Sequence, residues 1–300
     1  MIAQIELRHL RYFSTLAEEL HFGRAAARLG IAQPPLSQQI QRLESLLGSR
    51  LFDRTSRRVQ LTDAGRAFLV ETKRVLVGVE GAVEAARRAG RGETGELRVA
   101  FAATVMFLEL PRIIREFRDR FPQVHLDLRE MPTGPQLNAL RTGEIDLGFV
   151  REPGPDPELE IVTVMREPLR IAVPKSHPLA AKATLAVRHL AEEPFVLFPE
   201  ELAPGLYAQV IGLCRAAGFT PRVVEESREL YTSVSLVEAG VGVSILPASV
   251  EKLGWKGVRY RPIPSAAAET RISAAWRRDR VRPVVEAFMR VVREVVPPIP

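Results

Sequence analysis

Apolar residues recur at helical spacing in the first part of the chain. One set lies on a single face of an amphipathic helix: Leu10, Phe13, Ala17 and Leu20. An alanine-rich segment, 22–29, predicts a second helix that stops at Gly30. A third helix is expected over 33–47, because the prolines at its start fall in a first turn, where a missing amide does little harm. Its apolar positions again share one face: Leu36, Ile40, Leu43 and Leu47.

The following residues predict a hairpin and then one long helix. Two apolar segments, Leu51–Phe52 and Val59–Leu61, flank a charged run and indicate a β-hairpin with a basic tip. Residues 62–90 then show an a/d seam: Leu69, Thr72, Leu76, Val79, Val83 and Ala86. We expect this seam to pair with a second copy of the chain, because Gly78 and Gly81 weaken a helix that has no partner. Packing of the seam on its own chain is the competing interpretation.

A glycine-rich break at 90–95 separates this region from an alternation of strands and helices. Its spacing matches GxGxxG, but it follows a helix and opens a strand, so we reject a dinucleotide site. Strands are expected at 97–101, 125–129, 145–150, 169–173, 195–198, 223–225 and 243–246. Helices are expected at about 106–120, 134–142, 205–217, 230–239 and 281–295. This alternation is typical of parallel sheets with crossover helices, here in two similar α/β lobes with a cleft between them.

The positive charge of the chain is concentrated at its beginning. Residues 1–92 carry 15 Lys and Arg against 9 Asp and Glu, whereas residues 93–300 carry 27 of each sign. A basic module joined to a neutral one indicates a polyanion partner for the first, although a solvated basic surface explains the excess equally well. No apolar run is long enough to span a membrane, so no membrane partner is expected. A single cysteine and a charged first helix favour a cytoplasmic protein.

The segment 22–48 has the arrangement of a helix-turn-helix, whose second helix enters the major groove of DNA. Its candidate DNA-binding residues lie away from the apolar face: Gln33, Pro34, Ser37, Gln38, Gln41 and Arg42. Arg54, Arg57 and Arg58 on the hairpin predict a wing that holds backbone phosphates. A helical protein-interaction domain with a polar outer face would show a similar pattern.

A series of blocks follows in order along this region: Leu7–Phe13, His21–Ala26, Ile31–Ile40, Glu44–Gly48, Leu51–Arg54 and Leu61–Gly65. Together they resemble the amino-terminal domain of LysR-type transcriptional regulators, and the resemblance extends over essentially the whole chain. It implies a mixed fold: a winged helix-turn-helix (1–61), a linker and dimerisation helix (62–92), and an effector-binding domain (93–300) similar to type 2 periplasmic binding proteins. Lobe I would contain about 93–165 and 268–300, and lobe II about 166–267.

The resemblance also implies partners. Such regulators are typically dimers of dimers that bind promoter DNA and contact RNA polymerase when activated. Gln38 departs from the pattern, in which many members carry arginine next to the recognition serine.

Polar residues follow several predicted strands at the starts of helices, among them Thr104 and Thr133. Hydroxyls and free amides at such positions favour a small anion, particularly a carboxylate, although a lone threonine there is more often a helix cap. The segments 97–104, 110–114, 130–133 and 145–151 resemble one branch of the family, the activators of aromatic-compound catabolism that respond to muconate or benzoate.

That resemblance implies an effector site. Thr104 and Thr133 would bind inducer carboxylates, Arg151 would lie at the cleft edge, and Pro204 and Tyr207 would lie where the opposite lobe closes. A surface ion pair of Arg151 with Glu152 or Glu130 is the other interpretation of this arginine. Two acids near the cleft, Glu200 and Glu201, disfavour a dianion.

Catalytic signatures are missing from the sequence. The five histidines do not fall into HExxH or zinc-ligand spacing, Cys214 has no CxxC partner, and neither GxSxG nor a P-loop occurs. We therefore expect no catalytic residue, metal or cofactor. Together with the family resemblance, the sequence predicts a sequence-specific, inducer-responsive transcriptional regulator. Two other classes are a solute-binding protein for transport, which would need no helix-turn-helix, and an architectural DNA-binding protein with a vestigial ligand domain.

Overall fold

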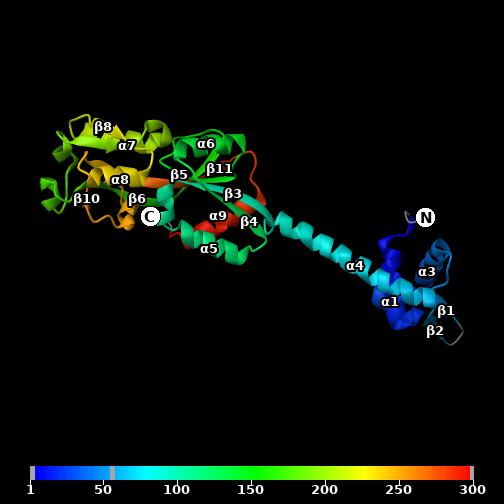
Figure 1. The fold of residues 1–300 in the computed structure, drawn as a ribbon. Helices are drawn as coiled ribbons and strands as arrows, with labels where there is room; N and C mark the ends of the chain where they lie inside the picture. The colour runs from blue at the N-terminus through cyan, green and yellow to red at the C-terminus, as the bar shows by residue number, and fades with distance from the viewer. Residues whose placement is uncertain (1–3, 55–57, 298–300) are drawn as a thin grey trace. The chain divides into compact units, whose positions relative to one another are not determined.

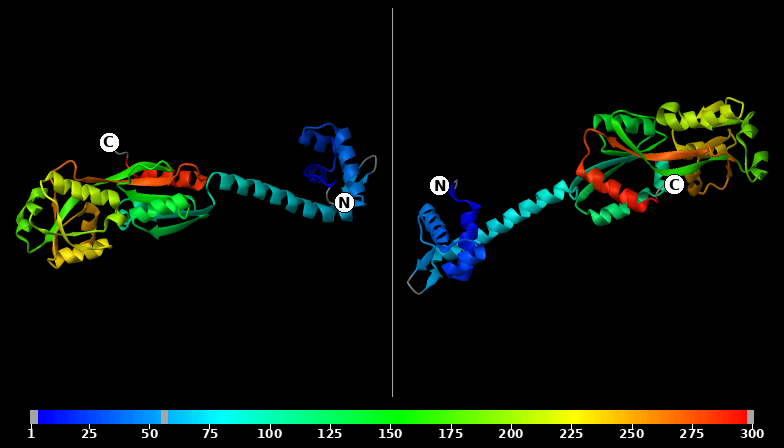
Figure 2. Two further views of the ribbon diagram at one scale, coloured as in Figure 1. Left: turned by 90° about the horizontal axis from the view of Figure 1, so that it is seen from above. Right: turned by 180° about the vertical axis from the view of Figure 1, so that it is seen from behind.

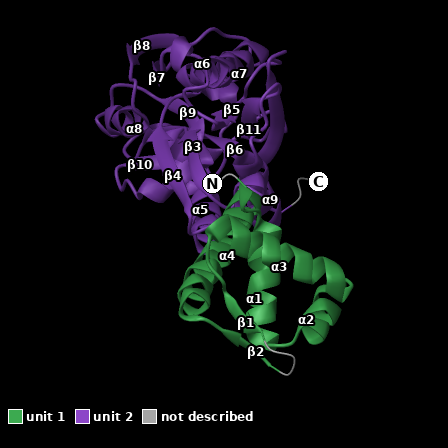
Figure 3. Ribbon diagram, turned by 90° about the vertical axis from the view of Figure 1, so that its right-hand side faces the viewer, with its two compact units in different colours: residues 1–87 green, residues 88–300 purple. Residues whose placement is uncertain are grey.

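The computed structural model describes residues 4–54 and 58–297. The chain divides into two compact units, Met1–Arg87 and Arg88–Pro300 (Figure 3). Within the described ranges, no helix combines the length and apolar character that crossing a membrane requires.

The first unit packs helices and a small hairpin around one apolar core. Its elements are α1 (Leu7–Glu19), α2 (Phe22–Leu29), α3 (Gln33–Leu47), β1 (Phe52–Arg54) and β2 (Val59–Leu61); α2 is labelled in Figure 3 and the others in Figure 1. β1 and β2 pair antiparallel, and α2 and α3 end at Gly30 and Gly48, both with φ of 67°, a conformation that suits glycine because it has no Cβ. The predicted helices and hairpin are confirmed; the tip residues 55–57 lie outside the described part.

α4 (Asp63–Gly90) carries the predicted seam, and the structure divides that seam. Thr72 is 1% exposed, and Leu69 packs against the core of the first unit. Further along, Val83 is 45% exposed. The beginning of the seam therefore packs on its own chain, as the competing interpretation holds, and its later part is open to a partner helix.

The second unit begins with a parallel sheet. Its first lobe contains β3 (Gly95–Phe101), η2 (Ala103–Phe107), α5 (Leu110–Arg120), β4 (Val124–Glu130), α6 (Thr133–Thr142), β5 (Leu147–Arg151) and, from the end of the chain, α9 (Pro283–Val295). β3 is parallel to both β4 and β5, so the carboxyl ends of these strands meet at one edge. α5 and α9 lie side by side (Figure 2), and the rings of Phe117 and Phe288 meet with centroids 4.8 Å apart.

A strand that the apolar pattern does not reveal in full joins the two lobes. β6 (Leu159–Pro174) pairs antiparallel with β11 (Glu269–Arg277), and further along with β9 (Ser244–Pro247) and β10 (Val258–Pro262). The sheet is therefore mixed, and the expectation of parallel sheets is wrong for these strands. The first part of β6 mixes buried, partly buried and exposed residues and includes polar side chains, so only its apolar end, 169–173, stands out in the sequence.

The second lobe covers both faces of the end of this sheet. Its other elements are η3 (Pro178–Ala181), η4 (Val187–Leu190), β7 (Pro194–Leu197), η5 (Glu200–Leu202), α7 (Pro204–Ala216), β8 (Arg222–Glu226), α8 (Leu230–Glu238) and η6 (Ala248–Leu253). On one face, Ile171 of β6 belongs to the same apolar cluster as Val210 of α7. On the other face, Ala172 of β6 packs with Val234 of α8.

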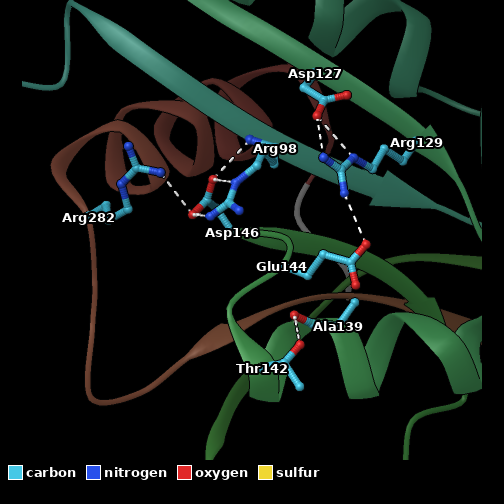
Figure 4. Close-up of polar contacts among 8 residues, drawn as sticks. All are labelled: Arg98, Asp127, Arg129, Ala139, Thr142, Glu144, Asp146 and Arg282. Atoms are coloured by element: carbon cyan, nitrogen blue, oxygen red, sulfur yellow. Dashed lines mark hydrogen bonds and ion pairs between the residues drawn. The ribbon is translucent and has the colours of Figure 1, made fainter.

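An ion-pair network at the amino-terminal end of β5 ties the first lobe together (Figure 4). Asp146 accepts hydrogen bonds from Arg98 of β3 (3.0 Å), and Arg282, at the start of α9, lies 2.8 Å from the same carboxylate. Burial by itself would raise the pKa of Asp146, but the hydrogen bonds from the two arginines outweigh it and hold the pKa below its ordinary value.

Asp146→Asn is expected to lower the free energy of unfolding at pH 7 by about 1.5–3 kcal/mol, the scale of a hydrogen bond to a charged group. Because the folded-state pKa is depressed, the stabilisation is complete above the unfolded-state pKa of about 4 and is lost as the pH falls through the folded-state value. Urea unfolding followed by tryptophan fluorescence measures it, since Trp255 and Trp276 both lie in the second unit.

The matched control is Asp127→Asn, which removes a more exposed carboxylate that pairs with Arg129 on the same strand. We expect this change to cost less than about 1 kcal/mol. A loss on Asp146→Asn that stays constant from pH 7 to pH 3 would contradict the assigned ionisation.

Candidate functional site

The outer face of α3 presents polar side chains to solvent. Leu36, Ile40 and Leu43 are fully buried and hold the helix to the core of the first unit. Exposed residues of its other face are Gln33, Pro34, Gln38, Gln41 and Arg42, with Ser37 partly exposed among them. Amides and a guanidinium on an exposed helix are the groups that read base edges in a major groove. The structure therefore brings together the predicted residues of the recognition helix.

The predicted wing arginines differ from one another. The guanidinium of Arg54 donates to Glu44 of α3 (2.6 Å) and lies over the ring of Phe22, 5.2 Å from its centroid. The other carboxylate oxygen of Glu44 accepts the backbone amides of Leu51 and Phe52. Arg54 thus anchors the hairpin to α3, Arg58 is exposed, and Arg57 lies outside the described residues.

One polar residue behind the recognition helix was not singled out from the sequence. His9 of α1 is 0% exposed, and its Nδ1 accepts the backbone amide of Glu6 (3.0 Å). Its Nε2 lies 2.9 Å from Oε1 of Gln39 on α3, so the ring donates there in the neutral tautomer. The contact fixes α3 against α1. The only sequence signal was a histidine at an inward-facing position of the first helix.

Three of the predicted effector-binding residues meet at the carboxyl edge of the first lobe's sheet. Thr104 follows β3, Thr133 begins α6 after β4, and Arg151 ends β5. The backbone amide of Arg151 donates to the hydroxyl of Thr133 (3.0 Å), and its Nη2 donates to the hydroxyl of Thr104 (2.9 Å). Parallel pairing of β3 with its neighbours produces this convergence.

Arg151 is not a surface residue. Its side chain is 3% exposed and its Nη2 donates to Glu167 of β6 at 2.5 Å, so the interpretation as a surface pair with Glu152 or Glu130 is wrong. The second carboxylate oxygen of Glu167 accepts the backbone amide of Ser249 (2.7 Å) in the other lobe. Nη1 of Arg151 is buried and, in the described part of the chain, has no hydrogen-bond partner. It is a cationic donor without an acceptor.

Glu167 was missed from the sequence, although a signal was present. It occupies every-other-residue register with Met165, Leu169 and Ile171, all buried on β6. A single acid in such an apolar register indicates a buried, paired carboxylate.

Thr104, Thr133 and Arg151 line a cavity of about 200 Å³ between the lobes, and Glu167 is not among the described residues of its lining. Most of its other walls are apolar: Ala102, Ala103, Met131, Pro132, Phe198, Leu202, Ala203, Leu206, Leu230 and Pro247. Of the predicted residues in α7, Pro204 and Tyr207 are not among the described residues of the lining. One residue of helix turns the side chain by about 100°, so Leu206 reaches the cavity and Tyr207 packs on Phe198 instead.

Glycines allow the lobes to approach closely beside the cavity. A Cβ on Gly205 of α7 would lie 1.8 Å from the carbonyl oxygen of Glu152, and one on Gly134 of α6 would lie 2.3 Å from that of Glu201. Glu152 itself has a φ of 45°, in the left-handed region, and its carboxylate accepts from Arg271. The two lobes are therefore in close backbone contact at these glycines.

Neither a metal-binding cluster nor an activated cysteine is found in the described part of the chain. No cluster of three or more His, Cys, Asp or Glu side chains there could hold a metal ion. Burial raises the pKa of Cys214 to about 11, so its thiol remains protonated.

The fold and these two surfaces define a helix-turn-helix protein with a two-lobed second domain. Residues 7–66 match the family described as "Bacterial regulatory helix-turn-helix protein, lysR family", and residues 90–297 match "LysR substrate binding domain". The chain belongs to the LysR family of transcriptional regulators, and the resemblance found in its sequence is confirmed.

Its relatives are named as regulators and not as enzymes. The "Uncharacterized HTH-type transcriptional regulator YnfL" of Escherichia coli is 45% identical, covering 91% of each chain. The HTH-type transcriptional regulator CatR of Pseudomonas putida is 38% identical and covers 97% of this chain and 99% of its own.

Solved structures agree over the whole length. The crystal structure of CbnR, a LysR family transcriptional regulator, has a TM-score of 0.79 at 34% identity and covers 96% of this chain and 100% of its own. Full-length CbnR complexed with its target DNA has a TM-score of 0.77 at 33% identity, covering 97% of this chain and 99% of its own.

Proposed function

We propose that this LysR-family regulator reads promoter DNA with the amino-terminal turns of α3 and that a small carboxylate in the interlobe cavity controls it. The DNA part rests on the exposed amides and guanidinium of α3, set against a buried apolar face. Gln33, Ser37 and Arg42 carry the base contacts, while Arg57 and Arg58 hold phosphates beside them.

Ser37→Ala is expected to lower the preference for target over random DNA by about 1–3 kcal/mol, the cost of a lost base contact. The target is a fragment that the native protein selects from a random pool. The measurement is the ratio of specific to non-specific affinity at one fixed salt concentration.

Ser45→Ala provides the control, because Ser45 is exposed on the same helix two turns later, away from the end that enters the groove. An unchanged preference in Ser37→Ala, with binding to random DNA intact, would exclude Ser37 from base reading.

The later part of the α4 seam supports self-association. Leu76 and Val79 are partly exposed and Val83 is 45% exposed, along one face of the helix. We propose that this face pairs with α4 of a second copy and that such dimers associate into a dimer of dimers, which contacts RNA polymerase at the promoter.

Val83→Glu is expected to weaken self-association at least tenfold, which corresponds to about 1.4 kcal/mol, because it places like charges in the paired seam. Sedimentation equilibrium over a range of protein concentrations measures the change. Val77→Glu is the control, since Val77 is 67% exposed but lies outside the seam. Equal effects of the two changes would argue against pairing through the seam.

The inducer proposal rests on one observation above all. Thr104, Thr133 and the unpaired Nη1 of Arg151 converge on one cavity whose other walls are largely apolar. A carboxylate supplies acceptors for these donors, and the apolar walls suit a hydrocarbon body. Binding between the lobes would change their separation and thereby the activity of the DNA-binding domains.

A carboxylate inducer at about 100 times its Kd is expected to stabilise the protein by roughly 2.7 kcal/mol. A thermal unfolding scan followed by tryptophan fluorescence, with benzoate, hexa-2,4-dienoate and muconate, measures this in the second unit. Thr133→Ala should abolish most of the shift because it removes a hydroxyl of the site.

Thr142→Ala is the matched control, because Thr142 lies in the last turn of the same helix and bonds backbone carbonyls there. No stabilisation by any carboxylate would overturn the carboxylate proposal and favour a DNA-binding protein that acts without a ligand.

A further inference from the structure

Building on the proposed inducer site, we infer that the cavity selects a compact carboxylate with a single negative charge, and that Glu167 sets this limit. The inference concerns the charge of the ligand, which the convergence of hydroxyls and arginine does not by itself specify. It follows from the buried ion pair that Arg151 of the lining already forms, from the groups at the rim of the cavity and from its size.

The buried charge of Arg151 in the lining is already balanced by its partner Glu167 before a ligand binds. Arg151 and Glu167 have side chains that are 3% and 5% exposed, and they form an ion pair with each other. Nη1 of Arg151 is left as a donor for one carboxylate. That carboxylate brings the buried cluster to a net charge of −1. A second would bring it to −2 without another buried cation, which is costly in a low-dielectric site.

The rim does not supply the missing positive charge. Besides Arg151, the described lining contains one other cationic side chain, Arg228, which is 67% exposed and lies 3.6 Å from the carboxylate of Glu201. Glu130 and Glu229 also belong to the lining and are exposed. A second carboxylate that reached the rim would therefore meet acids, which repel it.

The size of the cavity points the same way. Its volume of about 200 Å³ is below the roughly 300–1,000 Å³ of sites for drug-sized ligands. Beside the cavity, Gly134 and Gly205 bring the backbones of the two lobes into close contact. The ligand is a small apolar body with one charged end.

Glu167→Gln removes the negative charge of this side chain and keeps its shape. The amide is isosteric with the carboxylate and its oxygen can still accept the amide of Ser249, but it leaves the charge of Arg151 unbalanced. The variant should therefore tolerate a dianion better than the native protein does. Glu167→Asp keeps the charge and should keep the preference for a monoanion.

The experiment compares ligands that share a carbon skeleton and differ by one carboxylate. Hexa-2,4-dienoate is paired with muconate, and benzoate with terephthalate, in isothermal titration of the full-length protein. We expect the native protein to bind the monocarboxylate of at least one pair tenfold or more tightly than its partner. In Glu167→Gln this ratio should fall at least tenfold.

Glu160→Gln is the control, because Glu160 lies on the same strand but pairs with Arg278 and not with Arg151. Its mono-to-dicarboxylate ratio should match that of the native protein. Tryptophan fluorescence shows whether Glu167→Gln folds. If it does not, the mono-to-dicarboxylate ratios of the native protein and of Glu167→Asp still test whether the site prefers a single charge.

The remaining outcomes separate the two proposals. Tighter binding of the dicarboxylates by the native protein would overturn the single-charge inference and leave the carboxylate site standing. An unchanged ratio in a folded Glu167→Gln would overturn the role of Glu167. Binding of neither class would overturn the carboxylate site and the inference together.

Discussion

The buried ion pair between Arg151 and Glu167 is the contact on which the effector domain depends most. Arg151 ends β5 and, through its backbone and guanidinium, holds the hydroxyls of Thr133 and Thr104 in place. Glu167 connects this group to Ser249 in the second lobe. Removing water from two charges is expensive, and breaking such a pair leaves an uncompensated charge. The pair therefore holds the guanidinium that contacts Thr104 and links it to the second lobe.

The sheet provides the frame for that contact. β6 pairs with β11 in one lobe and with β9 and β10 in the other, so a single strand belongs to both. Glu167 lies where the strand passes between them, and its carboxylate contacts both Arg151 and the backbone of Ser249 in the second lobe. The first unit also contains a buried polar contact between two elements, because His9 of α1 forms a hydrogen bond with Gln39 of α3.

Local signals in the sequence were sufficient for much of the architecture. Helical spacing, glycine stops and turn chemistry act within a few residues, so they predicted α1 to α3, the hairpin and most alternating elements of the second unit. The strands that were missed, β10 and β11, and the first part of β6 owe their existence to pairing partners far away in the chain. For α4, the pattern gave the seam but not how much of it packs against α1.

The sequence alone determined the family, its helix-turn-helix region and the presence of Thr104, Thr133 and Arg151 at the ends of strands. Each of these depends on residue type and short-range order. The tertiary structure decided what those residues do together: that Arg151 is buried, that Glu167 neutralises it, that Leu206 and not Tyr207 faces the cavity, and that Arg54 anchors the hairpin to α3. These features arise from contacts between distant segments, whose charge balance and packing no local pattern encodes.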